Sequence, residues 1–244
     1  MTSTRTLSLG STDITLTAWE GGRTYMLLHG GGGPFTMAGF AGTLSDQTAA
    51  KVLLPTHPGF AGTSRPVELD STRALAAAYI DLLDELDLTG VTLVGNSFGG
   101  WLAAEVALLS SDRVAGLVIV NGVGIEVPGH PPTSVAGLTA AELAQLSFHD
   151  PALSPAARGD APKPDLGALI AYAGPTMSDP TLVDRLGSLD LPTRVLWGES
   201  DGIVDVDFGR AYAAAIPGAT FTLLPRAGHL PQVETPEQVL AAIV

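Results

Sequence analysis

Short apolar runs alternate with longer helical runs along most of this chain, and this alternation constrains its fold more than any other feature. Runs rich in Val, Leu, Ile and Thr recur at residues 14–20, 25–30, 51–55, 91–95, 114–122, 193–198 and 220–225. Helical patterns occur at residues 71–87, 98–110, 207–216 and 235–244. Apolar strands separated by helices are typical of a parallel sheet covered on both faces. The pattern predicts an α/β fold, and the short link between the first two runs suggests an antiparallel start.

The alternation is interrupted once, between residues 123 and 190. This stretch is rich in Pro, Gly and Ala, and its helical patterns at 138–146 and 180–186 are weak. It is too long for a structureless linker, so we interpret it as an insertion over the carboxyl edge of the sheet. The predicted organisation is a core of residues 1–122 and 191–244, interrupted by a cap segment of residues 123–190.

Composition excludes several classes of protein. Hydrophobic residues make up 45% of the 244 residues and charged ones 15%, which describes a globular protein with an ample core. The absence of cysteine excludes disulfides, thiolate zinc sites and a cysteine nucleophile. The five histidines lack metal-site spacing, so we expect no metal and no organic cofactor. A net charge of −13 disfavours a nucleic-acid partner.

The sequence also lacks signals for export or membrane insertion. Residues 1–13 do not combine a charged segment with an apolar one, and no window has 18 uninterrupted apolar residues. We therefore expect a cytoplasmic protein without a membrane partner. The sequence contains no heptad repeat, so it does not indicate an oligomeric state.

Two serines stand in the pattern Gly-x-Ser-x-Gly, which marks the sharp turn that carries the nucleophile of many hydrolases. They are Ser97, in GNSFG, and Ser200, in GESDG. Because glycine supplies 29 of the 244 residues, one accidental match is unsurprising, and context must decide.

The context favours Ser97. It follows a predicted strand and precedes a predicted helix, whose free N–H groups favour a developing negative charge. Its flanking glycines remove side chains that would clash in the turn. Ser200 is followed by Asp201, whose carboxylate would stand beside that charge, and no helix begins there. We therefore predict that Ser97 is the nucleophile and that the match at Ser200 is accidental.

A glycine-rich loop, HGGGGP at residues 29–34, follows the second predicted strand. Such loops supply a backbone N–H to the oxyanion in some hydrolases. A phosphate loop is the competing interpretation, but the G-x-x-x-x-G-K-[ST] pattern is absent. We expect the oxyanion hole to use the N–H of Phe98 and that of Gly31 or Gly32. We interpret His29 as a brace for the loop.

A serine nucleophile needs a base, and the base needs a carboxylate that fixes its tautomer. His229 lies on a loop after the last predicted strand, and Asp201 follows the strand before it. Because the carboxyl ends of parallel strands meet at one edge, Ser97, Asp201 and His229 are expected to converge as a catalytic triad.

These motifs together resemble the α/β-hydrolase superfamily across nearly the whole chain. The matching pieces are LLHGGGGP, HPGFAGTSRP, LVGNSFGGW, PTRVLWGESDGIV and AGHLPQVETPE. The resemblance implies a mostly parallel eight-stranded sheet, with helices on both faces and a small helical cap after the sixth strand. It also favours Asp201 over Asp205 and Asp207 as the acid. Some members carry the acid after the sixth strand, where Asn121 and Glu126 lie.

Three further residues are candidates for contact with a small-molecule substrate: Asn96, Leu230 and His57. Asn96 precedes the nucleophile, and Leu230 and Phe98 flank catalytic residues and are expected to line the acyl pocket. His57 ends a strand, where it either faces the crevice or braces its loop.

In the cap segment, Arg158 and Arg185 either bind a substrate carboxylate or are solvated. His130 and His149, also in the cap segment, are interpreted as structural.

The predicted reaction is hydrolysis of a carboxylic ester or lactone through an acyl-enzyme. A second reading is hydrolysis of a carbon–carbon bond in β-diketone-like ring-cleavage products, because such enzymes share the Asn96-Ser97 elbow. They often have Trp after the catalytic histidine, where this chain has Leu230, and their cap arginine has no clear counterpart. The motifs are also compatible with a cofactor-free perhydrolase, with an acyltransferase, and with a non-catalytic ligand-binding receptor on the same scaffold.

Overall fold

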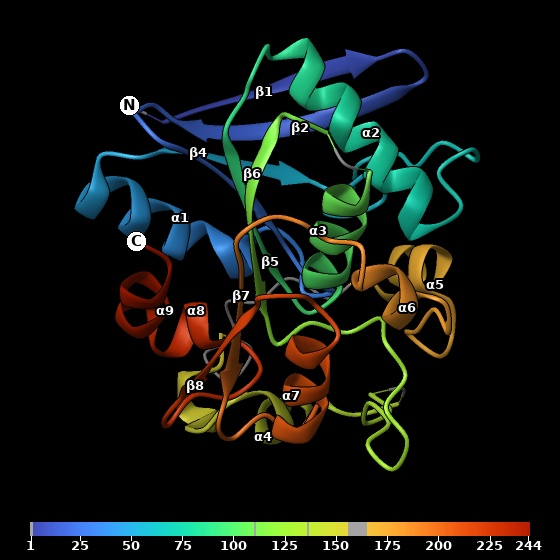
Figure 1. Ribbon diagram of the computed structural model, residues 1–244, viewed down its shortest axis with the longest axis vertical. Helices are drawn as coiled ribbons and strands as arrows, with labels where there is room; N and C mark the ends of the chain where they lie inside the picture. The colour runs from blue at the N-terminus through green and yellow to red at the C-terminus, as the bar shows by residue number, and fades with distance from the viewer. Residues whose placement is uncertain (1, 110, 136, 156–164) are drawn as a thin grey trace.

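The computed structural model describes residues 2–109, 111–135, 137–155 and 165–244. An eight-stranded sheet runs through the molecule with strand order β1-β2-β4-β3-β5-β6-β7-β8 (Figure 1). Its strands are β1 (Thr2–Leu9), β2 (Thr12–Trp19), β3 (Thr24–Leu28), β4 (Lys51–Thr56), β5 (Val91–Asn96), β6 (Val114–Val120), β7 (Thr193–Gly198) and β8 (Thr220–Leu224). The mostly parallel sheet of the predicted α/β fold is confirmed.

The helices in the described part of the chain occupy the links between these strands. They are α1 (Phe35–Thr48), α2 (Thr72–Glu85), α3 (Phe98–Leu108), α4 (Ala140–Ser147), the 3₁₀ turn η1 (Pro151–Leu153), α5 (Leu166–Ala173), α6 (Leu182–Leu186), α7 (Val206–Ala214), α8 (Pro231–Glu234) and α9 (Pro236–Ile243). None of the helices in the described ranges is long and apolar enough to cross a membrane.

The antiparallel part of the sheet differs from the expected one. The runs at 14–20 and 25–30 correspond to β2 and β3, which do not pair with each other. Instead, β2 pairs antiparallel with β1 and with β4, while β3 to β8 form the parallel part. The strand β1 is missing from the sequence prediction because most of its side chains are polar and exposed at the edge of the sheet.

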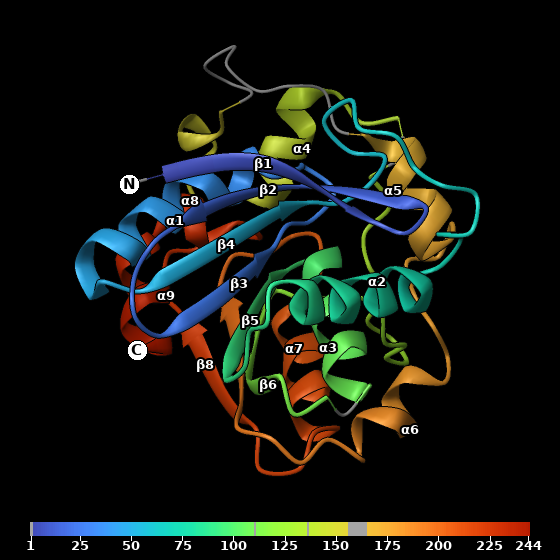
Figure 2. The same cartoon turned by 90° about the horizontal axis from the view of Figure 1, so that it is seen from above.

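The parallel strands alternate their side chains between two apolar layers. In β3, Met26 and Leu28 join the layer that includes α2, α3 and α7, while Tyr25 and Leu27 join the layer that includes α1 and α9. Figure 2 shows these two helical layers on opposite faces of the twisted sheet. Both faces of the parallel strands are therefore shielded from solvent, which explains the uninterrupted apolar runs in the sequence.

The segment of residues 123–190 lies between β6 and β7. Its described part contains α4, η1, α5 and α6. The helix α4 begins with a capping box, in which the Thr139 side chain accepts from the N–H of Glu142 and the Glu142 carboxylate accepts from the N–H of Thr139. The helices α1 and α5 have no counterpart in the sequence prediction.

Candidate active site

Ser97 lies on a sharp turn between β5 and α3, at the carboxyl edge of the parallel strands. Its backbone has a φ of 56° and a ψ of −120°, which is a strained conformation for a residue other than glycine. The flanking glycines permit this turn: a Cβ at Gly95 would overlap the carbonyl of Gly99, and a Cβ at Gly99 would overlap that of Leu28. The hydroxyl therefore stands at the N-terminus of an 11-residue helix, where negative charge is favoured.

His229 and Asp201 are in direct contact. The Nδ1–H group of His229 donates to Oδ2 of Asp201 over 2.8 Å, and the aspartate side chain is fully buried. The two residues follow the parallel neighbours β8 and β7, which bring their loops together at one edge. A carboxylate at Nδ1 fixes the tautomer whose Nε2 accepts a proton, as a general base must.

Three other donors hold the Asp201 carboxylate. The backbone N–H groups of Ile203 and Val204 donate to its Oδ1 over 2.8 and 3.0 Å. The Asn121 side chain donates to its Oδ2 over 2.5 Å. A buried carboxylate is costly unless it is hydrogen-bonded, and these donors satisfy the Asp201 oxygens. Asn121 thus supports the acid from the position after the sixth strand, while Glu126 has no contact with His229 and instead accepts from Ser178.

Asn96 ties the nucleophile turn to the loop of the base. Its side-chain N–H groups donate to the carbonyls of His229 and Val120 over 2.9 and 3.1 Å. Its Oδ1 accepts from Gln232 over 3.1 Å. The Asn96 side chain therefore joins the Ser97 turn to the His229 loop, and Asn96 also lines the cavity beside Ser97, so its contact with a substrate stays a prediction. Gln232, three residues after His229, is absent from the sequence prediction.

A cavity of about 180 Å³ lies where these elements meet. Ser97, His229 and Leu230 all line it, and Leu230 therefore has the position expected for a substrate contact. Within the described residues, no hydrogen bond joins the Ser97 hydroxyl to His229. Such bonds are often long before substrate binds, so the triad is inferred from the shared cavity and the His229–Asp201 contact.

Three backbone N–H groups beside the cavity are candidates for the oxyanion hole. Those of Phe98, Gly31 and Gly32 have no hydrogen-bond acceptor in the part of the chain that the structure describes. Gly31 and Gly32 line the cavity with Ser97. The preceding glycine, Gly30, packs against the nucleophile, since a Cβ there would come within 3.0 Å of the Ser97 Cβ.

Comparisons with known proteins agree with this arrangement. The model of the alpha/beta hydrolase family matches residues 26–242. The chain belongs to this family.

Among curated relatives of this hydrolase, a 2-hydroxy-6-oxononadienedioate/2-hydroxy-6-oxononatrienedioate hydrolase from Cupriavidus pinatubonensis is 30% identical, over 88% of this chain and 83% of that protein. A 2-hydroxy-6-oxo-6-phenylhexa-2,4-dienoate hydrolase from Burkholderia cepacia is 26% identical, over 87% and 83%. Among solved structures, a thermophilic esterase from Thermogutta terrifontis has a TM-score of 0.77 and 26% identity, covering 100% of this chain and 96% of its own.

The hydrolase does not use His57 as a substrate contact. Its ring is fully buried, its Nδ1 lies 2.5 Å from the hydroxyl of Tyr79, and its Nε2 lies 2.9 Å from the carbonyl of His29. His29 stacks on it and accepts from its backbone N–H. Burial lowers the pKa of both imidazoles, that of His29 to about 4. Both therefore stay neutral and brace the loops, and the expectation that His57 faces the crevice is wrong.

The ring of Phe98 also lies away from the cavity. It is fully buried among His57, Trp101 and Tyr172, so only its backbone N–H is available to the site. The other Gly-x-Ser-x-Gly serine, Ser200, lies 2.8 Å from Nδ1 of His149 and is outside the cavity lining. It joins the acid loop to the cap segment, which is a structural role.

Arg185 is engaged by two carboxylates of the protein itself. Its guanidinium makes two bonds of 2.6 Å to Glu105 on α3, and it also reaches Asp179 over 2.9 Å. This ion pair attaches α6 to the core and raises the pKa of Arg185. The other cap arginine, Arg158, lies outside the described residues.

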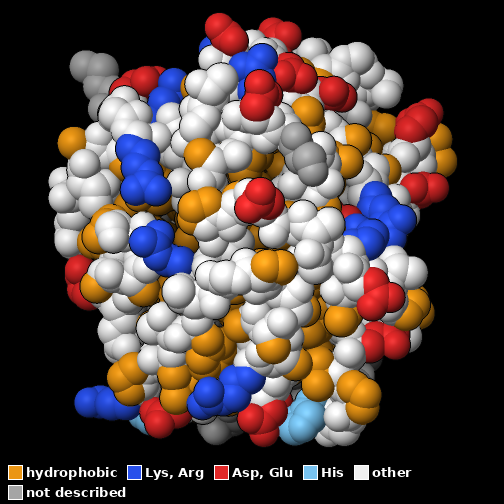
Figure 3. All heavy atoms as spheres, in the orientation of Figure 1, with side chains coloured by type: hydrophobic (Ala, Val, Ile, Leu, Met, Phe, Trp, Pro, Cys, Tyr) orange, Lys and Arg blue, Asp and Glu red, His pale blue; other side chains and the backbone are white. Residues whose placement is uncertain are grey.

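Two observations on the described residues bear on other kinds of site. No group of three or more His, Cys, Asp or Glu side chains could hold a metal ion within the described ranges. On the face in Figure 3, Lys and Arg side chains are scattered among acidic ones and form no continuous stripe. The cavity beside Ser97 is thus the best-supported site in the described part of the molecule.

Proposed function

We propose that this protein is a serine hydrolase that cleaves a carbon–carbon bond next to a ketone, with Ser97, His229 and Asp201 as its catalytic triad. The activities named for its curated relatives support carbon–carbon bond hydrolysis more than the ester hydrolysis predicted from the sequence. The observation that carries the proposal is the buried His229–Asp201 hydrogen bond at the rim of the cavity that Ser97 lines.

The chemistry follows from the placement of these groups. Nε2 of His229 takes the hydroxyl proton of Ser97, and the Ser97 oxygen attacks the ketone carbon. The N–H groups of Phe98 and of Gly31 or Gly32 stabilise the resulting oxyanion. The dienol must first tautomerise to its diketo form, in which the hydroxyl proton moves to the carbon next to the ketone. When the carbon–carbon bond then breaks, its electron pair moves into the conjugated carbonyl system and the proton on His229 neutralises the leaving group. Water then attacks the acyl-enzyme, with His229 again as the base.

The proposal is tested with Ser97→Ala and a 2-hydroxy-6-oxo-6-phenylhexa-2,4-dienoate as substrate. The loss of its visible absorbance reports cleavage. We expect kcat/KM to fall by roughly 1,000-fold or more, the range seen when a triad member is removed, while circular dichroism stays unchanged. The control is Ser200→Ala, which should retain activity within about threefold. Comparable turnover by Ser97→Ala would remove Ser97 from the mechanism.

Ester hydrolysis is the second candidate, and two observations favour it. The thermophilic esterase aligns with the whole chain, and the described lining of the cavity has no Lys or Arg to hold the carboxylate of a dienoate. A series of p-nitrophenyl esters from acetate to octanoate tests this candidate. A kcat/KM for the best ester above that for the dienoate would make ester hydrolysis the main activity.

A further inference from the structure

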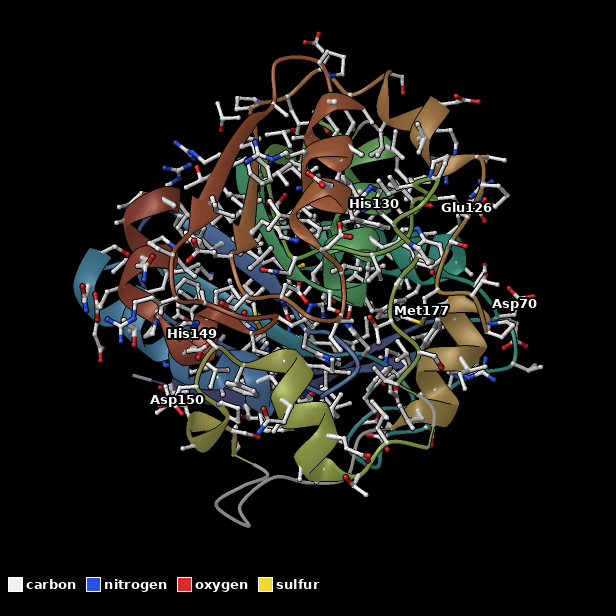
Figure 4. All side chains as sticks on the ribbon, turned by 90° about the horizontal axis from the view of Figure 1, so that it is seen from below. Asp70, Glu126, His130, His149, Asp150 and Met177 are labelled. Carbon is white, nitrogen blue, oxygen red and sulfur yellow. The ribbon has the colours of Figure 1, made fainter. Side chains whose placement is uncertain are left out.

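The cavity beside Ser97 adjoins a groove within the cap segment. This groove has a volume of about 830 Å³, and six residues line both spaces. They are Pro132, Thr133, Val135, Leu166, Leu169 and Met177. Figure 4 shows Met177 beside α5 and Glu126 nearer α6, on the same side of the molecule. A substrate that reaches Ser97 therefore extends into the groove if it is longer than the inner cavity.

The groove is apolar along α5. Leu166 and Ile170 are one helical turn apart on that helix and both line the groove. They are 43% and 53% exposed, which is high for large apolar side chains. Apolar side chains that remain exposed inside a concave site are a common sign of ligand contact. The groove is thus suited to a hydrocarbon or aromatic part of a substrate.

The charged side chains among the described lining residues of the groove are all acidic. Among its described lining residues, Glu126 and Asp184 are acidic and none is Lys or Arg. The Glu126 carboxylate is held in place by the Ser178 hydroxyl over 3.0 Å, and Ser178 also lines the groove. Arg185, on the same helix as Asp184, is engaged by Glu105 and is not a lining residue. A substrate carboxylate in this groove would meet like charges without a described cation to balance them.

We propose that the outer groove selects an uncharged, apolar substrate end and rejects a carboxylate there. This inference rests on the proposed function, because it concerns the substrate of the same Ser97 site. The substrates named for the two relatives differ at this end. A nonadienedioate has a carboxylate at both ends, whereas a 6-phenylhexadienoate has one carboxylate and one aromatic end. The groove fits the second kind of substrate, or an ester with an uncharged end.

The test compares matched substrates with and without the distal carboxylate. One pair is 2-hydroxy-6-oxo-6-phenylhexa-2,4-dienoate against 2-hydroxy-6-oxonona-2,4-dienedioate. A second pair is p-nitrophenyl hexanoate against mono-p-nitrophenyl adipate, and a third is 4-carbamoylphenyl butanoate against 4-carboxyphenyl butanoate. The adipate places the carboxylate on the acyl side of the ester, and the 4-carboxyphenyl ester places it on the alcohol side. One of the two ester pairs therefore brings the carboxylate into the groove.

We expect kcat/KM to favour the uncharged end at least tenfold in the dienoate pair or in one ester pair, at 150 mM NaCl. Glu126→Lys should reduce that preference at least fivefold, and the isosteric Glu126→Gln should reduce it by a smaller factor. The control is Glu85→Lys at the C-terminal end of α2, a charge change of equal size before β5 and so at the opposite edge of the sheet. It should leave the preference within twofold.

Binding measurements separate this inference from the proposed function. Calorimetric titration of Ser97→Ala with the same compounds gives dissociation constants without turnover. If the wild-type protein cleaves none of them, the proposed function fails, yet a tenfold weaker binding of the carboxylate members still supports the groove. Equal binding within threefold in every pair, or a preference that Glu126→Lys leaves unchanged, would overturn the inference.

Discussion

The backbone of Ser97 stores strain at the point where the proposed chemistry occurs. Its positive φ belongs to a region that glycine occupies freely and serine does not. The close packing of Gly95 and Gly99 against neighbouring carbonyls leaves no room for the turn to relax. The strained turn therefore keeps the Ser97 hydroxyl in a fixed position at the cavity, as expected of a pre-organised nucleophile.

This strain predicts that Ser97→Gly makes the protein more stable while it abolishes hydrolysis. Relief of the strained φ is worth about 1–3 kcal/mol, and the extra freedom of glycine in the unfolded chain removes about 0.5–1 kcal/mol. We expect a net gain of about 1 kcal/mol in the free energy of unfolding, measured with urea. Ser97→Ala keeps the Cβ and should stay within about 0.5 kcal/mol of the wild type. A Ser97→Gly variant less stable than Ser97→Ala would contradict the strain argument.

At the scale of elements, an ion pair between Arg185 and Glu105 joins the cap helix α6 to the core helix α3, beside the buried Leu182 and Leu186 of α6. Glu105 is 3% exposed and Arg185 is 27% exposed, so the carboxylate depends on its partners. Those partners are two guanidinium nitrogens of Arg185, the indole N–H of Trp101, which donates over 3.1 Å, and the more distant Arg73, whose Nε lies 3.9 Å away. The attachment therefore rests on a charge that is costly to leave unpaired.

Arg185→Met is expected to reduce the free energy of unfolding by about 3 kcal/mol, because it leaves the Glu105 carboxylate buried without its main partner. The double variant Glu105→Gln/Arg185→Met removes that charge as well, so it should recover at least half of the loss. Urea unfolding followed by tryptophan fluorescence measures both. A double variant that is no more stable than Arg185→Met would show that the loss comes from packing and not from the charge.

At the scale of the whole molecule, two neutral imidazoles are buried beneath the catalytic edge. Burial lowers the pKa of His29 from 6.5 to about 4 and that of His57 well below 6.5. The unfolded chain therefore takes up protons between pH 6.5 and pH 4 that the folded protein does not. By linkage, these histidines contribute their full stability above pH 6.5, and that contribution is lost as the pH falls towards 4.

We expect the free energy of unfolding to decline steeply between pH 6.5 and pH 4, with His29 alone accounting for about 3 kcal/mol at the lower end. Urea titrations at four pH values across this window measure the slope. In His29→Asn the titrating group is absent, so its stability should fall less steeply with pH than that of the wild type. Equal slopes in the two proteins would show that other groups control the acid sensitivity.

Local sequence patterns were enough to predict the parallel strands, the nucleophile elbow and the candidate triad. Apolar runs and glycine spacing act over a few residues, and parallel strands necessarily bring the loops of Ser97, Asp201 and His229 to one edge. The hydrogen bond between His229 and Asp201 agrees with that prediction.

The remaining properties depend on contacts between residues far apart in the chain, which no local pattern encodes. Tertiary packing gave Asn96 the role of holding the base loop, buried His57 against Tyr79, and engaged Arg185 with Glu105. It also formed the acidic, apolar groove from residues 125–135, which precede α4, and residues 166–184, which begin with α5. Polar side chains take their partners from whatever the fold places within hydrogen-bond distance, so their roles are decided only when the chain has folded.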